Sequence, residues 1–273
     1  MSLIAACSNS VGIALIFISI FWKIGDFPDL YGMIFSGHVD EARRDLTEYI
    51  TNITGLAFML SCMMSVSSSS NVIMQVPLQA PVMERELASK MYSPTAYFIG
   101  CFMSTLIVQF IHPVILFTGM FFCIGIDTSF QNYCWVMAYA QISNFLFCGQ
   151  GYLLGILVTD ENDVKLVNLL FLLTWTTGTG ILCNLSTANW FVRGLSHVSP
   201  GRYNTEGFVR CLTRQVPDLN LNETLPLPVS QQDILKQFEF TWGEEYCLYA
   251  LIIWFFALFA MSLIAINLKY RKF

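Results

Sequence analysis

The chain has 273 residues and a formal net charge of −5, and 55% of its residues are hydrophobic while only 12% are charged. A soluble domain carries about 25% charged residues, so this composition excludes an ordinary soluble domain and indicates a membrane protein. The acidic balance gives no support for nucleic-acid binding, and the nine cysteines show no Cys-x-x-Cys pair or metal-ligand spacing, so we expect no metal or redox site.

Six apolar stretches lie between the charged residues, and each is long enough to cross a bilayer, which takes about 20 apolar residues. They predict an all-α, polytopic membrane protein with six transmembrane helices. The predicted spans are 3–22, 52–74, 95–125, 133–158, 166–185 and 246–268.

The connections between these spans differ in length and polarity. Residues 25–50 are predicted to form a polar loop of mixed charge, 127–132 a tight hairpin and 159–165 a short acidic turn. The connection 186–245 is long, moderately polar and contains prolines, so we expect a small folded cap rather than a linker.

A polar segment, 77–92, separates the second and third predicted spans. Pro77 and Pro81 should stop a helix arriving from the second span, because proline lacks the N–H and disfavours helix in the residue before it. The stretch 84–91 then predicts a short amphipathic helix, and Ser93-Pro94 is typical of a helix start. Such a helix offers a surface on which a partner outside the bilayer could act.

Lysine and arginine near the span ends predict the orientation, because cytoplasmic loops are enriched in them. With six spans, both termini, segment 77–92 and the acidic turn share one side, which carries Arg85, Lys90, Lys165, Lys269, Arg271 and Lys272. The other side carries Lys23, Arg43 and Arg44 near the membrane. Both termini are therefore expected in the cytosol or its organellar equivalent. The Asn-x-Ser/Thr sequons at Asn52, Asn184 and Asn222 all fall on the opposite, translocated side.

Polar residues inside the predicted spans have two readings each. Ser61, Ser65, Ser68 and Asn71 could line a central cavity, or they could let helices pack closely, as small polar residues do in membranes. His112 is the only histidine inside a span, which makes it a candidate for substrate binding or a proton relay. Alternatively, it could serve the backbone carbonyl that the following proline leaves without a partner.

Two motifs carry a family resemblance. The stretch Pro81-Val-Met-Glu-Arg-Glu86, followed by Tyr92-Ser-Pro and Tyr97-Phe, resembles the coupling helix and third-span start of the G subfamily of ATP-binding-cassette (ABC) transporters, which includes the pleiotropic-drug-resistance transporters. The stretch Gly180-Ile-Leu-Cys-Asn184, with Trp190 and residues 199–206, is similar to the family's fifth-span end and re-entrant segment. The resemblance covers about residues 50–273.

This resemblance implies a single ABC-transporter-like transmembrane domain over 1–273, with a cytosolic coupling helix between the second and third spans and an outer re-entrant cap at 185–245. The implied contacts with an ATPase domain involve Glu84, Arg85, Glu86 and Tyr92. The implied apolar valve is Ile181 and Leu182, and the re-entrant segment contains Arg202, Tyr203 and Glu206. The alternatives are a solvated loop, whose ion pairs contribute about 0–1 kcal/mol, and ordinary apolar span residues.

The sequence also departs from the family pattern. It contains no Gly-x₄-Gly-Lys-[Ser/Thr] loop, so we predict no nucleotide-binding domain and no catalytic activity, and ATP and Mg²⁺ would bind a partner chain. Gln79 and Met83 stand where the family has glutamate and phenylalanine. Val66 and neighbouring serines replace the aromatic clamp of the second span, so Val66 is counted with the cavity residues.

The leading hypothesis is the transmembrane half of an ABC exporter of lipid-like or amphipathic substrates, paired with a like domain as a homo- or heterodimer and driven by an ATPase on another chain. The alternative is a structural subunit of a larger membrane complex that has lost its ATPase. A channel or ion-coupled carrier is a third hypothesis. Membrane lipids are expected partners in each case, and Cys211 and Cys247 are expected to approach one another closely enough for a disulfide.

Overall fold

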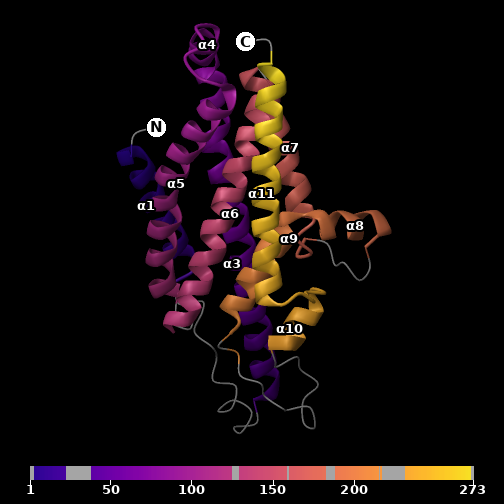
Figure 1. Cartoon of the computed structure of the whole chain (residues 1–273). Coiled ribbons are helices and arrows are strands. Elements are labelled where there is room, and N and C mark those ends of the chain that lie inside the picture. The colour runs from indigo at the N-terminus through magenta and orange to yellow at the C-terminus, as the bar shows by residue number, and fades with distance from the viewer. Residues whose placement is uncertain are drawn as a thin grey trace.

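The computed structural model of the chain describes residues 3–22, 38–124, 129–158, 160–182, 188–214, 216 and 231–271. All regular elements in these ranges are helices, which confirms the all-α prediction. The long helices run side by side in one bundle, and α8 projects sideways from it (Figure 1). The helices are α1 (Leu3–Ile20), α3 (Val39–Ile73), α4 (Gln75–Ala88), α5 (Pro94–Ile124), α6 (Phe130–Leu157), α7 (Glu161–Thr177), α8 (Trp190–Val198), α9 (Pro200–Leu212), α10 (Gln231–Gln237) and α11 (Glu244–Lys269).

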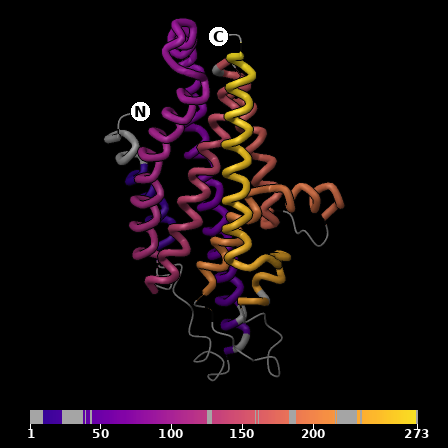
Figure 2. The backbone as a smooth tube through the Cα atoms, in the orientation of Figure 1, coloured from indigo at the N-terminus to yellow at the C-terminus, as the bar shows by residue number. Residues whose placement is uncertain are grey.

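Within the described ranges, three helical stretches are long and apolar enough to cross a membrane, namely Asp40–Ala88, Pro94–Ile124 and Glu244–Lys269. The other three predicted spans correspond to α1, α6 and α7 and stay a prediction as membrane spans. Helix α11 ends toward the end of the bundle that carries α4 (Figure 2), and α1 begins toward the same end (Figure 1). The predicted clustering of both ends of the chain with segment 77–92 therefore agrees with the arrangement of the helices.

Two predicted helix boundaries are wrong. Helix α3 begins at Val39, so the C-terminal part of the predicted polar loop 25–50 is helical, while residues 23–37 lie outside the described residues. Its first turns bury apolar side chains at helical spacing, including Leu46 and Tyr49, and the prediction gave the charges more weight than this spacing. Helix α7 ends at Thr177, short of the predicted limit of 185, because the chain turns into the left-handed region at Gly180, with φ 86°.

The predicted helix stop at Pro77 and Pro81 is also wrong. Helix α4 spans Gln75–Ala88, contains Pro81 in its interior, and is separated from α3 only by Met74. Pro77 lies in the first turn of α4, where a missing N–H is tolerated. Pro81 is exposed, so the backbone carbonyl that would have accepted a hydrogen bond from an N–H at this position lies near solvent. The predicted helix start at Ser93-Pro94 is confirmed, because α5 begins at Pro94 and the Ser93 hydroxyl accepts a hydrogen bond from the Ala96 N–H at 3.3 Å.

Helix α6 occupies the centre of the bundle and packs closely against α3. An added Cβ at Gly151 would lie 2.8 Å from the carbonyl oxygen of Ser69, and one at Gly155 would lie 3.1 Å from the carbonyl oxygen of Ile73, at the end of α3. Two glycines four residues apart allow the backbones of membrane helices to come together in this way. The contact between α3 and α6 therefore depends on the absence of two side chains.

We predict that Gly151→Ala lowers the thermal unfolding midpoint of the solubilised protein, since the new methyl group meets backbone rather than a flexible side chain. Overpacking of this kind costs typically about 1–3 kcal/mol. Gly12→Ala on α1 is the matched control, because an added Cβ there has nothing within 4 Å. Heating followed by size-exclusion chromatography measures both midpoints, and equal midpoints would contradict the close α3–α6 contact.

Candidate functional site

Helix α4 extends past the neighbouring helices at one end of the bundle and has two different faces (Figure 1). Met83 and Leu87 are buried in a cluster that includes Phe98 and Ile266, which fixes α4 to α5 and α11. Glu84 and Arg85 are exposed on the other side, and among the described residues neither forms an ion pair. The outward face of α4 is therefore open to solvent in this chain.

Two of the predicted ATPase-contact residues meet each other. The Tyr92 hydroxyl donates a hydrogen bond to the Glu86 carboxylate, and the Tyr92 ring stacks on Tyr97 with centroids 5.6 Å apart. The turn between them is closed by Lys90, which has φ 54° and whose N–H donates to the Leu87 carbonyl at 2.9 Å. Glu86 and Tyr92 thus stiffen the α4–α5 turn, whereas Glu84 and Arg85 project outward.

The C-terminal end of α11 packs against α4. The Lys269 ammonium donates to the Ile156 carbonyl oxygen at 2.6 Å, which ties α11 to the end of α6. Tyr270 is buried beside α4, and burial raises the pKa of its hydroxyl, with the negative charge of Glu84 adding to the effect. Movement of α4 would therefore disturb the ends of α6 and α11.

The serine row of α3 lies inside the bundle. The Ser61 hydroxyl accepts from the Asn204 amide of α9 at 2.9 Å, and Ser68 donates to the Asn144 side chain of α6. Ser65 donates to the Ser61 carbonyl within α3 at 2.8 Å. Each of these serines is buried, so in this structure the row holds α3 to α6 and α9.

Asn144 also serves the proline of α5. Pro113 has no N–H to donate to the carbonyl of Gln109, one turn earlier, and the Asn144 amide donates to that carbonyl at 2.7 Å. The alternative role considered for His112 thus falls to Asn144. The signal for it in the sequence is an asparagine in the middle of an apolar helix.

A polar groove separates α3 and α4 from α5 on the α4 side of this proline. Its volume is about 340 Å³, and it is lined by Asn71, Gln75, Gln79, Gly100, Cys101, Ser104, Thr105, Val108, Gln109, His112 and Tyr152. Of the predicted cavity residues, Asn71 and His112 line this groove. Ser61, Ser65 and Ser68 are in the helix contacts described above, and Val66 is 47% exposed on the surface of α3.

His112 joins three helices at the inner end of the groove. Its Nδ1 lies 2.5 Å from the Ser10 hydroxyl of α1, and its Nε2 lies 3.1 Å from the Ser67 hydroxyl of α3. A neutral imidazole can serve both contacts, because one ring nitrogen donates and the other accepts. The side chain is buried, so its ring is held in place by hydrogen bonds on both nitrogens.

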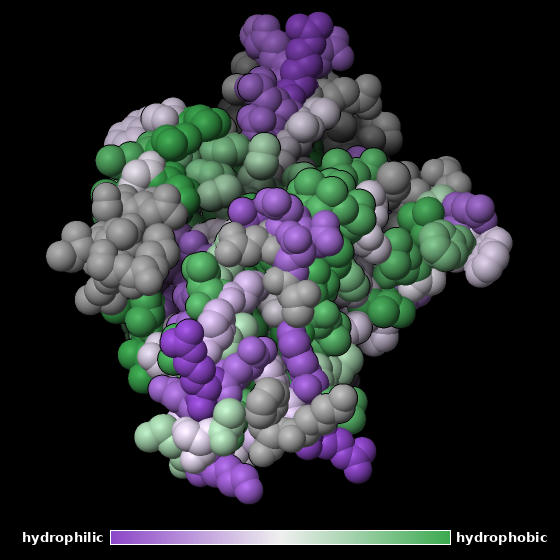
Figure 3. Space-filling view, turned by 90° about the horizontal axis from the view of Figure 1, so that it is seen from above, coloured by the Kyte–Doolittle hydropathy of each residue, from purple (hydrophilic) through white to green (hydrophobic). Residues whose placement is uncertain are grey.

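Seen from above, hydrophilic side chains stand at the top, in the middle and at the bottom of the view, and largely hydrophobic side chains lie to both sides of them (Figure 3). This distribution fits a bundle whose sides contact lipid and whose end contacts water. The α4 surface therefore belongs to the wetted end of the molecule.

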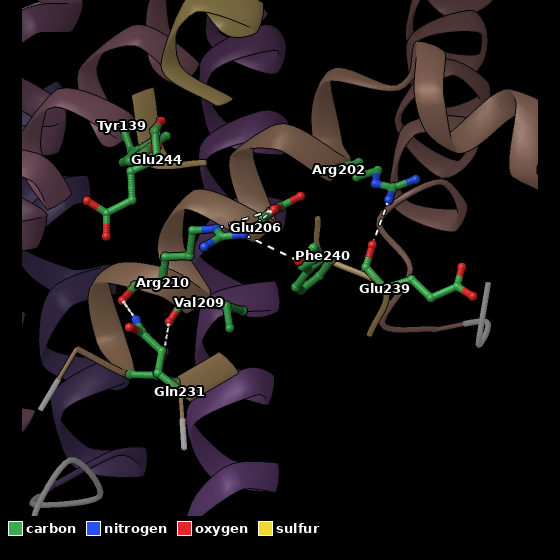
Figure 4. Close-up of polar contacts among 10 residues, drawn as sticks. Tyr139, Arg202, Glu206, Val209, Arg210, Gln231, Glu239, Phe240 and Glu244 are labelled. Carbon is green, nitrogen blue, oxygen red and sulfur yellow. Dashed lines mark hydrogen bonds and ion pairs between the residues drawn. The ribbon is translucent and has the colours of Figure 1, made fainter. Parts of the chain in front are cut away.

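Helix α9 lies at the other end of the polar row and carries buried charges (Figure 4). The Glu206 carboxylate pairs with the Arg210 guanidinium at 2.9 Å, and Arg202 donates to the Ser196 hydroxyl at 2.7 Å and the Glu239 carbonyl at 2.9 Å. Burial raises the pKa of the Glu206 carboxyl, while the Arg210 charge acts to lower it. The charges of the segment resembling the family's re-entrant stretch are thus paired or hydrogen-bonded.

The remaining predicted residues lie around α9. Tyr203 is half-buried and donates from its hydroxyl to the His197 carbonyl at 2.7 Å. Ile181 and Leu182 follow the end of α7 in a non-helical turn, Ile181 half-buried and Leu182 56% exposed, and Asn184 lies outside the described residues. Cys211 and Cys247 are both buried free thiols, and the expectation that they approach within disulfide distance stays a prediction.

We predict that Arg210→Met destabilises the protein strongly, because it leaves the buried Glu206 carboxylate without its partner. Loss of one member of a buried pair costs on the order of 3 kcal/mol. Burial raises the folded-state pKa of Glu206, so the variant should regain stability as pH falls, because the protonated carboxyl no longer needs the charge of Arg210.

The matched control is Arg214→Met, whose pair with Glu244 at 2.5 Å is partly exposed, with side-chain exposures of 24% and 25%. It should shift the thermal midpoint little, because exposed pairs contribute about 0–1 kcal/mol. A pH-independent loss in the Arg210→Met variant would contradict the assignment of the cost to an unpaired Glu206.

Comparison with known proteins agrees with this architecture. The chain is 21% identical over 267 residues to ABC transporter G family members 52 and 53 of Oryza sativa subsp. japonica, and 20% identical over 260 residues to pleiotropic drug resistance protein 1 of Petunia hybrida. These matches cover 96%, 96% and 95% of this chain, which spans only 18%, 17% and 17% of the relatives' lengths. Residues 1–212 match the family described as ABC-2 type transporter. The chain therefore belongs to the ABC-2 type transporter family of multi-pass integral membrane proteins.

Proposed function

We propose that this chain is the transmembrane half of an ABC exporter that moves lipid-like or amphipathic substrates. An ATPase domain outside residues 1–273 drives it and binds the ATP and Mg²⁺. Residues 1–273 act as one transmembrane domain with no catalytic role of their own, and α4 is the coupling helix on the cytosolic side. Residues 185–245 form the re-entrant cap on the other side.

The observation that carries the proposal is the pair of faces on α4. Its inner face is fixed to α5 and α11 by buried Met83 and Leu87, so a displacement of α4 would be transmitted to two long apolar helices. Its outer face presents Leu78 and Val82, 63% and 54% exposed, beside Arg85. Two exposed apolar side chains one turn apart, with a charged side chain beside them, are typical of a surface that binds another protein.

A like transmembrane domain is proposed to cover the outer stripe of α3. Met59 is 50% exposed and Val66 is 47% exposed, and Thr51 and Ser70 continue the same uncharged stripe along the helix. A second copy or a homologous partner would cover this stripe without burying a charge. In such a dimer, Ile181 and Leu182 would form the apolar valve, and Arg202, Tyr203 and Glu206 would stabilise the re-entrant segment behind it.

The test compares two variants of α4 in the complex with its ATPase, reconstituted in lipid nanodiscs. Arg85→Ala should change the free energy of unfolding by no more than about 0.5 kcal/mol, since it removes an exposed side chain. Amphiphile-stimulated ATP hydrolysis should fall about fivefold or more, because coupling requires contacts that differ between two states. Arg44→Ala, the same change at an exposed position near the start of α3, is the control and should change neither quantity.

A photo-reactive residue placed at Leu78 gives a second readout of the same proposal. It should cross-link to a chain that contains the Gly-x₄-Gly-Lys-[Ser/Thr] loop, whereas one placed at Ile107, 73% exposed on α5, should cross-link to lipid. Unchanged stimulated hydrolysis in Arg85→Ala would rule out coupling through this face. Cross-linking of Leu78 only to chains without that loop would favour a structural subunit instead.

A further inference from the structure

The polar groove between α3–α4 and α5 has two facing rows of uncharged polar side chains. Asn71, Gln75 and Gln79 are spaced four residues apart along α3 and α4, and Ser104 and Gln109 face them from α5. The groove volume of about 340 Å³ lies at the lower end of the range of about 300–1,000 Å³ for ligand pockets. This is enough room for one compact polar group.

No lysine, arginine, aspartate or glutamate is among the described residues that line the groove. A cationic group would find no carboxylate there, and an anionic group would find no guanidinium or ammonium. An ion that enters such a site loses hydration without gaining a counter-charge, which is unfavourable. The lining therefore selects for a neutral polar group.

Several lining groups retain hydrogen-bonding capacity. Gln109 is only 7% exposed, and within the described ranges its side-chain amide has no hydrogen-bond partner. A carboxamide offers two donors and one acceptor, and the Gln109 amide is not among the fully buried side-chain groups without a partner, so it opens onto the groove that it lines. The Asn71 amide and the Ser104 hydroxyl on the same groove are likewise without partners among the described residues. A ligand with adjacent hydroxyl or amide groups would complete this set.

Other lining groups are already held in fixed positions. Thr105 bonds to the Tyr152 hydroxyl at 2.7 Å and donates to the Gln75 side-chain oxygen at 3.3 Å. The Tyr97 hydroxyl donates to the Gln79 side-chain oxygen at 3.3 Å, which leaves the Gln79 NH₂ group to donate elsewhere. The lining is thus ordered before any ligand enters, which reduces the entropy cost of binding.

The same turns of α5 present an apolar surface next to the groove. Met103 and Ile107 are 51% and 73% exposed on the far side of the helix from Gln109. A polar group in the groove would therefore lie one helix width from acyl chains packed on α5. This geometry favours the headgroup of an amphiphile over a free water-soluble molecule.

We infer that the groove binds the uncharged, hydroxyl- or amide-bearing headgroup of an amphiphile, such as the sugar of a neutral glycolipid. The inference rests on the proposed exporter function, because the bound amphiphile would be the substrate that is transported. It assigns selectivity to charge, with neutral headgroups accepted and charged headgroups rejected.

The test uses three lipids with the same photo-reactive acyl chain, namely a glucosyl diacylglycerol, phosphatidylserine and a diacyl trimethylammonium lipid. Each is added to the full complex in nanodiscs without nucleotide, and labelled peptides are quantified. The glucosyl lipid should label peptides from 71–79 and 100–112 at least about tenfold more than either charged lipid. Equal labelling by all three lipids would overturn the inference.

Gln109→Leu should weaken saturable labelling by the glucosyl lipid about tenfold, because it removes the unpaired amide. The matched control is Phe110→Leu, an adjacent residue that is 51% exposed on the lipid side and should keep full labelling. Ser104→Ala is the second variant, chosen because Ser104 is exposed and its loss leaves the core intact. If neither Gln109→Leu nor Ser104→Ala weakens labelling, the groove is not the binding site.

A competition arm separates a lipid headgroup from a free polyol. Excess methyl glucoside in the buffer should leave glucosyl-lipid labelling unchanged, and full displacement would show that the site takes a water-soluble sugar instead. The labelling requires no ATP hydrolysis, so it is independent of the α4 experiment. If the groove is labelled but hydrolysis is not coupled, the binding site is supported and the exporter function is contradicted. If hydrolysis is coupled but the groove is not labelled, only the binding site is contradicted.

Discussion

The structure depends on one buried amide, the side chain of Asn144 at the centre of α6. It donates to the carbonyl that Pro113 leaves unpaired in α5 and accepts from Ser68 of α3. A backbone carbonyl without a partner is especially costly inside a membrane, where no water replaces the lost bond. Asn144 removes this cost and joins α3, α5 and α6 at one point. Gly151 and Gly155, further along α6, then let α3 come close enough to continue the contact.

Helices α3, α6 and α11 link the two ends of the molecule that carry charged residues. All three contact α9, whose Glu206–Arg210 pair is buried, and all three contact α4 or the cluster that holds it. A displacement of α4 would therefore act on α9 through packed helices and buried hydrogen bonds. This arrangement suits a transporter, in which an event at one end must change access at the other. The polar groove lies beside this linkage, between α4 and the proline of α5.

The helices could be predicted from the sequence because charged residues interrupt the apolar stretches. The cap at Ser93-Pro94 could be predicted for a local reason, since its hydrogen bond joins residues three positions apart. The extent of α4 could not, because the proline rule describes isolated helix interiors, whereas α4 is held by tertiary burial of Met83 and Leu87. The role of Ser61 depends on Asn204, a residue on another helix and 143 positions away, and no local pattern predicts which helix a serine faces. The groove escaped prediction for the same reason, although the repeated carboxamides at Asn71, Gln75 and Gln79 were a usable signal.

The most direct test of the central role of Asn144 is a double-mutant cycle with Pro113. Asn144→Leu alone should lower the thermal stability, because the Gln109 carbonyl loses its donor. Pro113→Ala supplies a backbone N–H that can donate to the same carbonyl, so Asn144→Leu should cost less in that background. We expect a coupling free energy of about 0.5–3 kcal/mol between the two positions. The same loss of stability in both backgrounds would contradict the claim that Asn144 holds the bundle together by satisfying this carbonyl.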